Sequence, residues 1–133
     1  MTLAHHDLCF GCGLANVFGL QIELERQADG SVAGRFFVKQ DHQGPPGFAH
    51  GGVLAAALDE ATALAAGEGT GGPITAHLEL DFLAPAPIGA FVTLTAEVKR
   101  EEGGKLWVLA RALAEDRVTE LARARALLVR RVG

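Results

Sequence analysis

The chain has 133 residues, of which 49% are hydrophobic and 21% are charged, a balance that excludes a disordered chain and predicts one domain over residues 1–133. The formal net charge is −4 and basic residues are scattered, which excludes the basic surface of a nucleic-acid-binding protein. No uncharged apolar run reaches the roughly 18 residues of a membrane span, and the first residues lack the features of a secretion signal. We therefore expect a cytoplasmic protein with reduced thiols, bound neither to nucleic acid nor to a membrane.

A cysteine pair, Cys9 and Cys12, lies in an N-terminal extension that we place at residues 1–16. Together with His5 and His6 it supplies four possible zinc ligands. The second, distant pair of the usual zinc-finger spacing is absent, and no βαβ context for a redox CxxC follows. The sequence thus favours two small apolar side chains in a turn, with neither a metal nor a cofactor.

Two alternating segments come next. Residues 20–26 alternate apolar and polar side chains, which predicts a half-buried strand. Turn residues at 28–31 and a second strand at 32–39 complete a predicted hairpin. The Gly- and Pro-rich residues 40–49 predict a constrained loop.

Residues 51–67, GGVLAAALDEATALAAG, predict one helix, because an apolar run this long without Pro exceeds the usual strand. Residues 53–58 are apolar without interruption and are expected to be buried on all sides. The helix begins with two glycines, and none of the usual capping residues precedes it. Asp59 and Glu60 stand in its middle.

The start and the middle of this helix outline a hydrolytic site. Uncapped N–H groups at His50, Gly51 and Gly52 would face a negatively polarised oxygen. About two turns on, Asp59 could activate water or attack a carbonyl carbon. The alternative stays open: the glycines serve close packing, and the acids form a buried ion pair or reach the surface.

Four strands are predicted after the helix, at residues 75–82, 91–99, 105–113 and 118–129. Their short connections predict an antiparallel meander. The polar face of the first of these strands carries both Thr75 and His77. His77 is interpreted as a solvent or dimer-interface residue, with a place in the cleft near Asp59 as the alternative.

One apolar helix and about six strands predict an α+β fold in which a curved antiparallel sheet wraps around the helix. Exposed sheet edges and an outer face with Phe91 and Trp107 favour pairing with a second copy. One basic cluster is interpreted as a solvated face, with contact to an anionic cofactor such as a nucleotide phosphate as the alternative. It comprises Arg123, Arg125, Arg130 and Arg131.

Three motifs stand in order: CFGCG followed by Asn16, Gly19 and Leu20; HQGPPGFAHGGVLAAALDEA; and TAHLELDFLAPAPIG. Over nearly the whole chain the sequence resembles the PaaI-like hot-dog-fold thioesterases, which split acyl-coenzyme A thioesters. The resemblance implies a hot-dog fold, a homodimer or a dimer of dimers, and acyl-CoA as substrate, with coenzyme A present only as part of it. Two departures are Gly44, where many relatives carry Asn, and Ala84, where some carry Arg.

The same resemblance assigns roles to residues. The family's His-Gly-Gly falls on His50, Gly51 and Gly52, and its acid falls on Asp59. The Gly51 amide would bind the thioester oxygen, and Asp59 of the neighbouring copy would act as nucleophile or general base. Gly52 of the His-Gly-Gly motif is a candidate for substrate binding, and so are Thr62, Thr75 and His77, which have no firm motif match in the family.

The predicted function is therefore hydrolysis of an acyl-CoA to free acid and coenzyme A. A hydratase or dehydratase is one alternative, in which His50 with Asp59 or Glu60 moves protons and leaves the thioester intact. A non-catalytic acyl-CoA-binding module is another. The acyl group itself depends on the shape of a cleft between two chains, which no single motif encodes.

Overall fold

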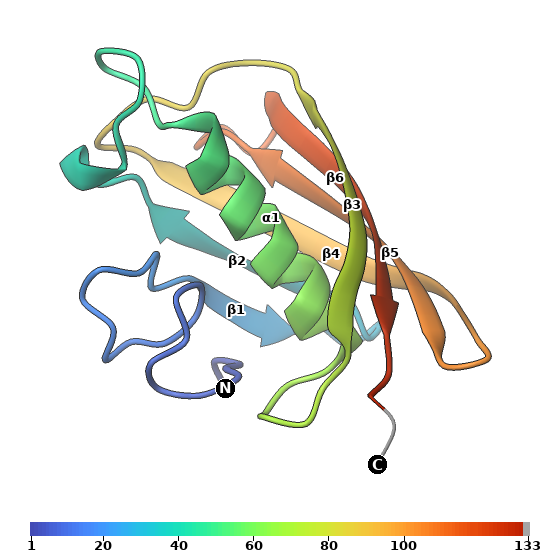
Figure 1. Cartoon of the computed structure of the whole chain (residues 1–133). Helices are drawn as coiled ribbons and strands as arrows, with labels where there is room; N and C mark the ends of the chain where they lie inside the picture. The colour runs from blue at the N-terminus through green and yellow to red at the C-terminus, as the bar shows by residue number, and fades with distance from the viewer. Residues whose placement is uncertain (132–133) are drawn as a thin grey trace.

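A computed structural model describes residues 1–131 as one antiparallel sheet and one long helix. The elements are β1 (Glu23–Arg26), β2 (Val32–Phe37), the short 3-10 helix η1 (Gln40–His42), α1 (Gly51–Ala66), β3 (Ile74–Phe82), β4 (Phe91–Glu102), β5 (Lys105–Leu113) and β6 (Glu120–Val129). The strand order is β1-β2-β4-β5-β6-β3, and neighbouring strands are antiparallel. The curved sheet carries α1 on one face (Figure 1), which confirms the predicted α+β hot-dog architecture.

The hydrophobic core lies between α1 and the sheet. Leu54, Leu58 and Ala61 recur at helical spacing and are almost completely buried. The opposite face of α1 is only half-buried and carries Val53, Ala56 and Asp59. The expectation that residues 53–58 are buried on all sides is therefore wrong for a single chain, because the sheet covers only one face of the helix.

The predicted four-strand meander is wrong at its first connection. β4, β5 and β6 follow one another as expected, but β3 pairs with β6 at the sheet edge. Residues 83–90 connect β3 at one edge of the sheet to β4, which lies on the other side of β5 and β6 and next to β2. Hydrogen bonds hold this connection against the end of β2 and the loop before α1: Gly89 N–H donates to the Val38 carbonyl at 2.8 Å, and Ala49 N–H donates to the Ala86 carbonyl at 2.8 Å.

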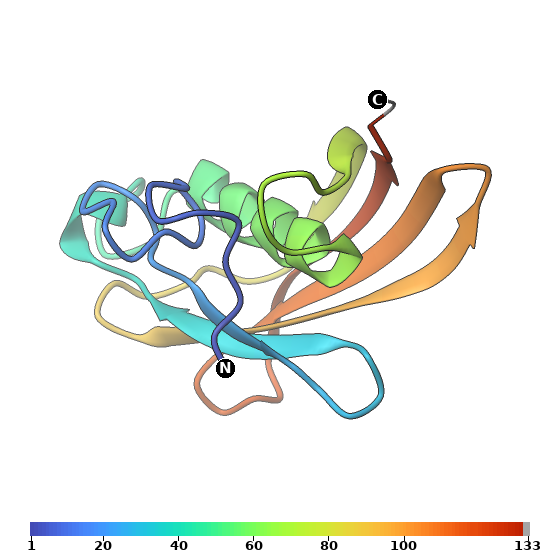
Figure 2. The same ribbon diagram turned by 90° about the horizontal axis from the view of Figure 1, so that it is seen from below.

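The N-terminal segment lies on the same side of the sheet as α1 (Figure 2). In this segment the Phe10 carbonyl accepts a hydrogen bond from the Leu20 N–H, and the Gly11 carbonyl accepts one from the Ile22 N–H. The predicted first strand is shortened to Glu23–Arg26 because Gln21, with φ of 51°, interrupts the extended backbone. Within residues 1–131, no helix is long and apolar enough to cross a membrane.

Candidate functional site

The imidazole of His50 caps the N-terminus of helix α1. The His50 backbone is extended (φ −62°, ψ 138°), and its Nδ1 accepts the Gly52 N–H at 2.8 Å. The expected uncapped start is thus wrong, since the imidazole takes the place of the usual Ser, Thr, Asp or Asn. An accepting Nδ1 places the ring proton on Nε2 in the neutral side chain.

The neighbouring Gly51 N–H is left free. The His50 N–H donates to the His42 carbonyl at 2.8 Å, and the Val53 N–H donates to the His50 carbonyl at 2.9 Å. Among the acceptors of residues 1–131, none receives the Gly51 N–H. The Gly51 amide is therefore a hydrogen-bond donor at the positive end of the helix dipole, available to an external oxygen.

Asp59 lies on the half-buried face of α1, where β3 meets the helix. Its Oδ1 accepts a hydrogen bond of 2.7 Å from the Thr75 hydroxyl. This contact depends on a register shift in β3 between Thr75 and His77. Such a bulge breaks the two-residue alternation, so that Thr75 turns toward the helix.

His77 faces away from the helix. It lies 3.3 Å from Glu79, which in turn pairs with Arg125 at 3.3 Å on the outer face of the sheet. The prediction that Thr75 and His77 share a face is wrong because of the bulge, and His77 does not line a cleft beside Asp59 of its own chain. Its exposed position agrees with the plainer interpretation of a solvent or interface histidine.

Thr62 is fully buried. Its hydroxyl donates to the Asp59 carbonyl at 2.8 Å, as threonines within helices often do. In the single chain the Thr62 hydroxyl is used within the helix and is out of reach of solvent, so its predicted contact with substrate stays a prediction without structural support.

The Gly51 amide and the Asp59 carboxylate stand eight residues apart on one helix. At 1.5 Å per residue their backbones are about 12 Å apart along the helix axis. One thioester group cannot contact both within a single chain. If both act in one reaction, they must come from two copies.

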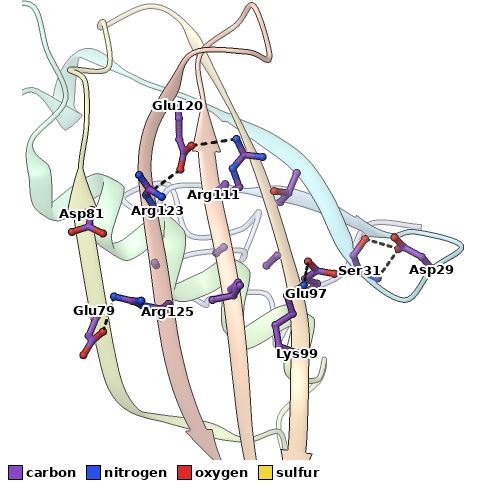
Figure 3. A pocket seen from close by; sticks show the side chains of 15 residues that line it. Asp29, Ser31, Glu79, Asp81, Glu97, Lys99, Arg111, Glu120, Arg123 and Arg125 are labelled. Atoms are coloured by element: carbon purple, nitrogen blue, oxygen red, sulfur yellow. Dashed lines mark hydrogen bonds and ion pairs between the residues drawn. The ribbon is translucent and has the colours of Figure 1, made fainter.

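A pocket of about 700 Å³ lies elsewhere, on the outer face of the sheet (Figure 3). Paired charges form part of its lining: Arg111 and Arg123 both contact Glu120, at 3.3 and 3.5 Å. Neither Gly51 nor Asp59 borders it, so its volume does not mark the predicted chemistry.

The predicted basic cluster is divided between two parts of the sheet surface. Arg123 and Arg125 lie on the outer face with Glu120 and Glu79. At the far end of β6, Arg130 pairs with Glu101 at 2.7 Å, and Arg131 donates to the carbonyls of Thr70 and Gly72. Each guanidinium already has an acceptor within the chain, which supports the interpretation as a solvated face.

A second group of reactive side chains lies on the other side of α1. His5, Cys9 and Cys12 of the N-terminal segment converge on Glu60 of the helix. The Cys12 sulfur, and next the Glu60 carboxylate, raise the pKa of His5 to about 11, against the effect of burial. Burial opposes ionisation of Glu60, yet the close approach of His5 and Cys12 holds its pKa below the ordinary value. Burial raises the pKa of the Cys12 thiol.

Known proteins share this fold and this sequence pattern. The family model described as "Thioesterase superfamily" matches residues 46–121. Acyl-coenzyme A thioesterase THEM4 of Xenopus laevis is 36% identical over 74 residues, which are 56% of this chain and 33% of that protein. Human acyl-coenzyme A thioesterase THEM5 is 39% identical over 84 residues, 61% of this chain and 33% of that protein. The chain thus covers about a third of the length of these curated relatives.

Solved structures agree. A crystal structure of a thioesterase superfamily protein superposes with a TM-score of 0.84 and 29% identity, covering 92% of this chain and 60% of that chain. Escherichia coli PaaI, from the phenylacetic acid degradation operon, superposes with a TM-score of 0.76 and 23% identity. The match covers 86% of this chain and 82% of that chain. A Streptococcus mutans protein bound to acetyl-CoA superposes with a TM-score of 0.74 and 18% identity. The match covers 83% of this chain and 88% of that chain. The chain belongs to the thioesterase superfamily.

Proposed function

We propose that this protein hydrolyses acyl-CoA thioesters to a free acid and coenzyme A. The observation that carries the proposal is the free Gly51 N–H at the start of the helix that bears Asp59. The curated relatives named acyl-coenzyme A thioesterase, and the structural neighbour with acetyl-CoA bound, support this substrate class.

The two groups have complementary tasks in thioester hydrolysis. Negative charge develops on the thioester oxygen in the transition state, and a fixed N–H such as that of Gly51 stabilises it there. Asp59 either removes a proton from the attacking water or attacks the carbonyl carbon itself. The hydrogen bond from Thr75 fixes one carboxylate oxygen and leaves the other for this chemistry.

The active unit in this proposal is a homodimer or a dimer of dimers. β3 is an edge strand of nine residues, and unpaired edges of this length invite pairing with another chain. Ile74 and Phe82 on β3 are 54% and 56% exposed, and the adjacent face of α1 is apolar and half-buried. Pairing β3 with its copy would extend the sheet and bring the helix start of one chain toward Asp59 of the other.

The reaction is tested with a panel of short-chain, medium-chain and aromatic acyl-CoAs, and release of free thiol is followed with a thiol reagent. We expect release with at least one member of the panel and loss of most of it in Asp59→Asn. A hydratase or dehydratase would alter the acyl group without releasing thiol. Tight binding without turnover across the panel would instead indicate a binding module.

The shared site is tested by mixing two inactive variants. Asp59→Asn lacks the acid, and Gly51→Pro lacks the N–H of residue 51. Co-expressed chains form mixed dimers in which one site carries both defects and the other carries neither. Recovery of up to about one quarter of wild-type activity is expected for such a shared site. Recovery of no activity, with mixed dimers demonstrated by mass spectrometry, would place the site within one chain.

A further inference from the structure

Four possible metal ligands meet beside the middle of α1. The ligand atoms of His5, Cys9, Cys12 and Glu60 all lie within 4.8 Å of one another. Nδ1 of His5 is 3.8 Å from Sγ of Cys9 and 3.6 Å from Sγ of Cys12. In a tetrahedral zinc site, bonds of about 2.0–2.3 Å place the ligand atoms about 3.3–3.8 Å apart. Both sulfur–nitrogen distances fall in this range, so one ion could contact the imidazole and both sulfurs.

In the described part of the chain, the polar contacts of the Glu60 carboxylate all come from this same group of side chains, and Cys9 Sγ donates to its Oε1 at 3.5 Å. Glu60 is only 8% exposed. Its Oε2 lies 2.7 Å from Nδ1 of His5 but outside hydrogen-bonding geometry, and within residues 1–131 this oxygen has no hydrogen-bond partner. The short distance places both atoms in the same small space. A buried carboxylate oxygen without a hydrogen bond is costly, and a cation bound in that space would satisfy it.

The surrounding backbone is arranged to hold these side chains. The His5 N–H donates to Sγ of Cys12 at 3.2 Å, and such contacts orient and stabilise a metal-binding thiolate. The Gly13 N–H donates to the Cys9 carbonyl at 2.8 Å and closes the turn. A Cβ on Gly11 would overlap the Glu60 side chain, so glycine lets the turn approach the helix.

We propose that His5, Cys9, Cys12 and Glu60 bind one zinc ion that joins the N-terminal segment to α1. Two thiolates with an imidazole favour zinc over magnesium or calcium, which prefer oxygen ligands. Four protein ligands fill the tetrahedral coordination, so the ion is structural and not catalytic.

The proposed site differs from the expectation of no metal, which rested on the spacing of the ligands in the sequence. Zinc-finger spacing requires a second ligand pair close together in the sequence, whereas Glu60 lies 51 residues after Cys9. The helix supplies the fourth ligand, and His6, which is exposed, is not part of the group. The CxxC pair and His5 were visible in the sequence, and the signal for the fourth ligand was an acid in an apolar helix. The ion would also fix Glu60, the neighbour of Asp59.

The metal is measured directly on the full chain. The protein is purified under reducing conditions without added zinc and without a histidine tag, and its metal content is determined by inductively coupled plasma mass spectrometry. We expect about one zinc per chain, because ligands of this kind bind zinc tightly. His5→Gln is expected to lose most of the zinc, and the matched variant His6→Gln to retain it. Equal zinc content in these two variants, or negligible zinc after incubation with zinc chloride, overturns the site.

A measurement on the wild-type chain avoids variants that fail to fold. Metal-bound thiolates react slowly with a thiol reagent, so Cys9 and Cys12 are expected to react only after a chelator is added. Chelation is also expected to lower the melting temperature, and zinc to restore it. Immediate reaction of both thiols without chelator, or a Cys9–Cys12 disulfide that persists under reduction, overturns the proposal. None of these readouts depends on thioesterase activity.

Discussion

The Thr75 hydroxyl on the edge strand β3 donates a 2.7 Å hydrogen bond to Oδ1 of Asp59 on α1. The bond joins the predicted acid to the strand that we expect to pair with a second copy. It exists because of the register shift between Thr75 and His77, since an unbroken strand would place both side chains on one face. In the proposed dimer, the orientation of the acid and the pairing of the two chains would therefore be linked through β3.

Substitution Thr75→Val removes the hydroxyl and keeps the shape of the side chain. A hydrogen bond of this kind contributes about 0.5–1.5 kcal/mol, so kcat should fall about two- to tenfold with little change in KM. Thr75→Ser keeps the donor and is the matched control. Steady-state kinetics on the best acyl-CoA distinguish the two, and an unchanged kcat for Thr75→Val would show that Asp59 needs no such orientation.

Gly51→Pro removes one N–H from the first position of α1. Proline suits this position, and the extended backbone of His50 is the conformation that precedes proline. We expect kcat to fall about 10²- to 10³-fold, the usual effect of losing one donor to a developing oxyanion. Gly51→Ala is the control, because its Cβ would meet Phe82 at an ordinary 3.7 Å and the N–H remains. Equal loss in both variants would indicate a steric effect and not a missing donor.

Two variants of His50 distinguish a capping role of its side chain from a role in proton transfer. His50→Ala should lower the free energy of unfolding by about 0.5–2 kcal/mol, because the Gly52 N–H loses its acceptor. His50→Asn supplies another acceptor and should keep both the stability and most of the activity. Chemical denaturation and thiol-release assays test this. Loss of activity in a fully stable His50→Asn would instead assign the imidazole a chemical role, as in the hydratase alternative.

The lowered pKa of His42 predicts that the free energy of unfolding decreases at acidic pH. Burial, and next the charge of Lys39, lower the pKa of His42 below 6.5, while Asp41 acts in the opposite direction. Its Nδ1 accepts the Lys39 N–H at 3.0 Å, and its carbonyl accepts the His50 N–H. Because the folded pKa is below the unfolded one, this stabilisation is present above pH 6.5 and is lost as pH falls through the folded value.

The measurement is the free energy of unfolding of wild type and His42→Gln between pH 7.5 and 5. The wild type should lose stability relative to the variant as the pH falls below about 6.5, because glutamine does not titrate. Taking the difference between the two proteins removes the contribution of every other titrating group. Parallel curves would show that His42 is not responsible.

Much of the fold could be predicted from local pattern. The helix was expected over 51–67 and is observed at Gly51–Ala66, and the strand expected over 105–113 is β5. The resemblance placed a donor at Gly51 and an acid at Asp59, and the structure leaves the first free and orients the second. His50 as a cap and Thr62 as a buried residue were not predicted, because side-chain hydrogen bonds depend on rotamers that periodicity does not report.

The helix, the strands, their order along the chain and the family were all predictable from the amino acids, because hydrophobic period, turn residues and motifs are local properties of the chain. Three features became visible only in the folded chain: β3 lies beyond β6, Thr75 turns toward Asp59, and Glu60 meets a cysteine pair far away in the sequence. All three depend on contacts between segments that are distant in the sequence. Alternation and spacing fix the backbone of one segment, whereas the free energy of contacts between distant segments decides which partners it meets.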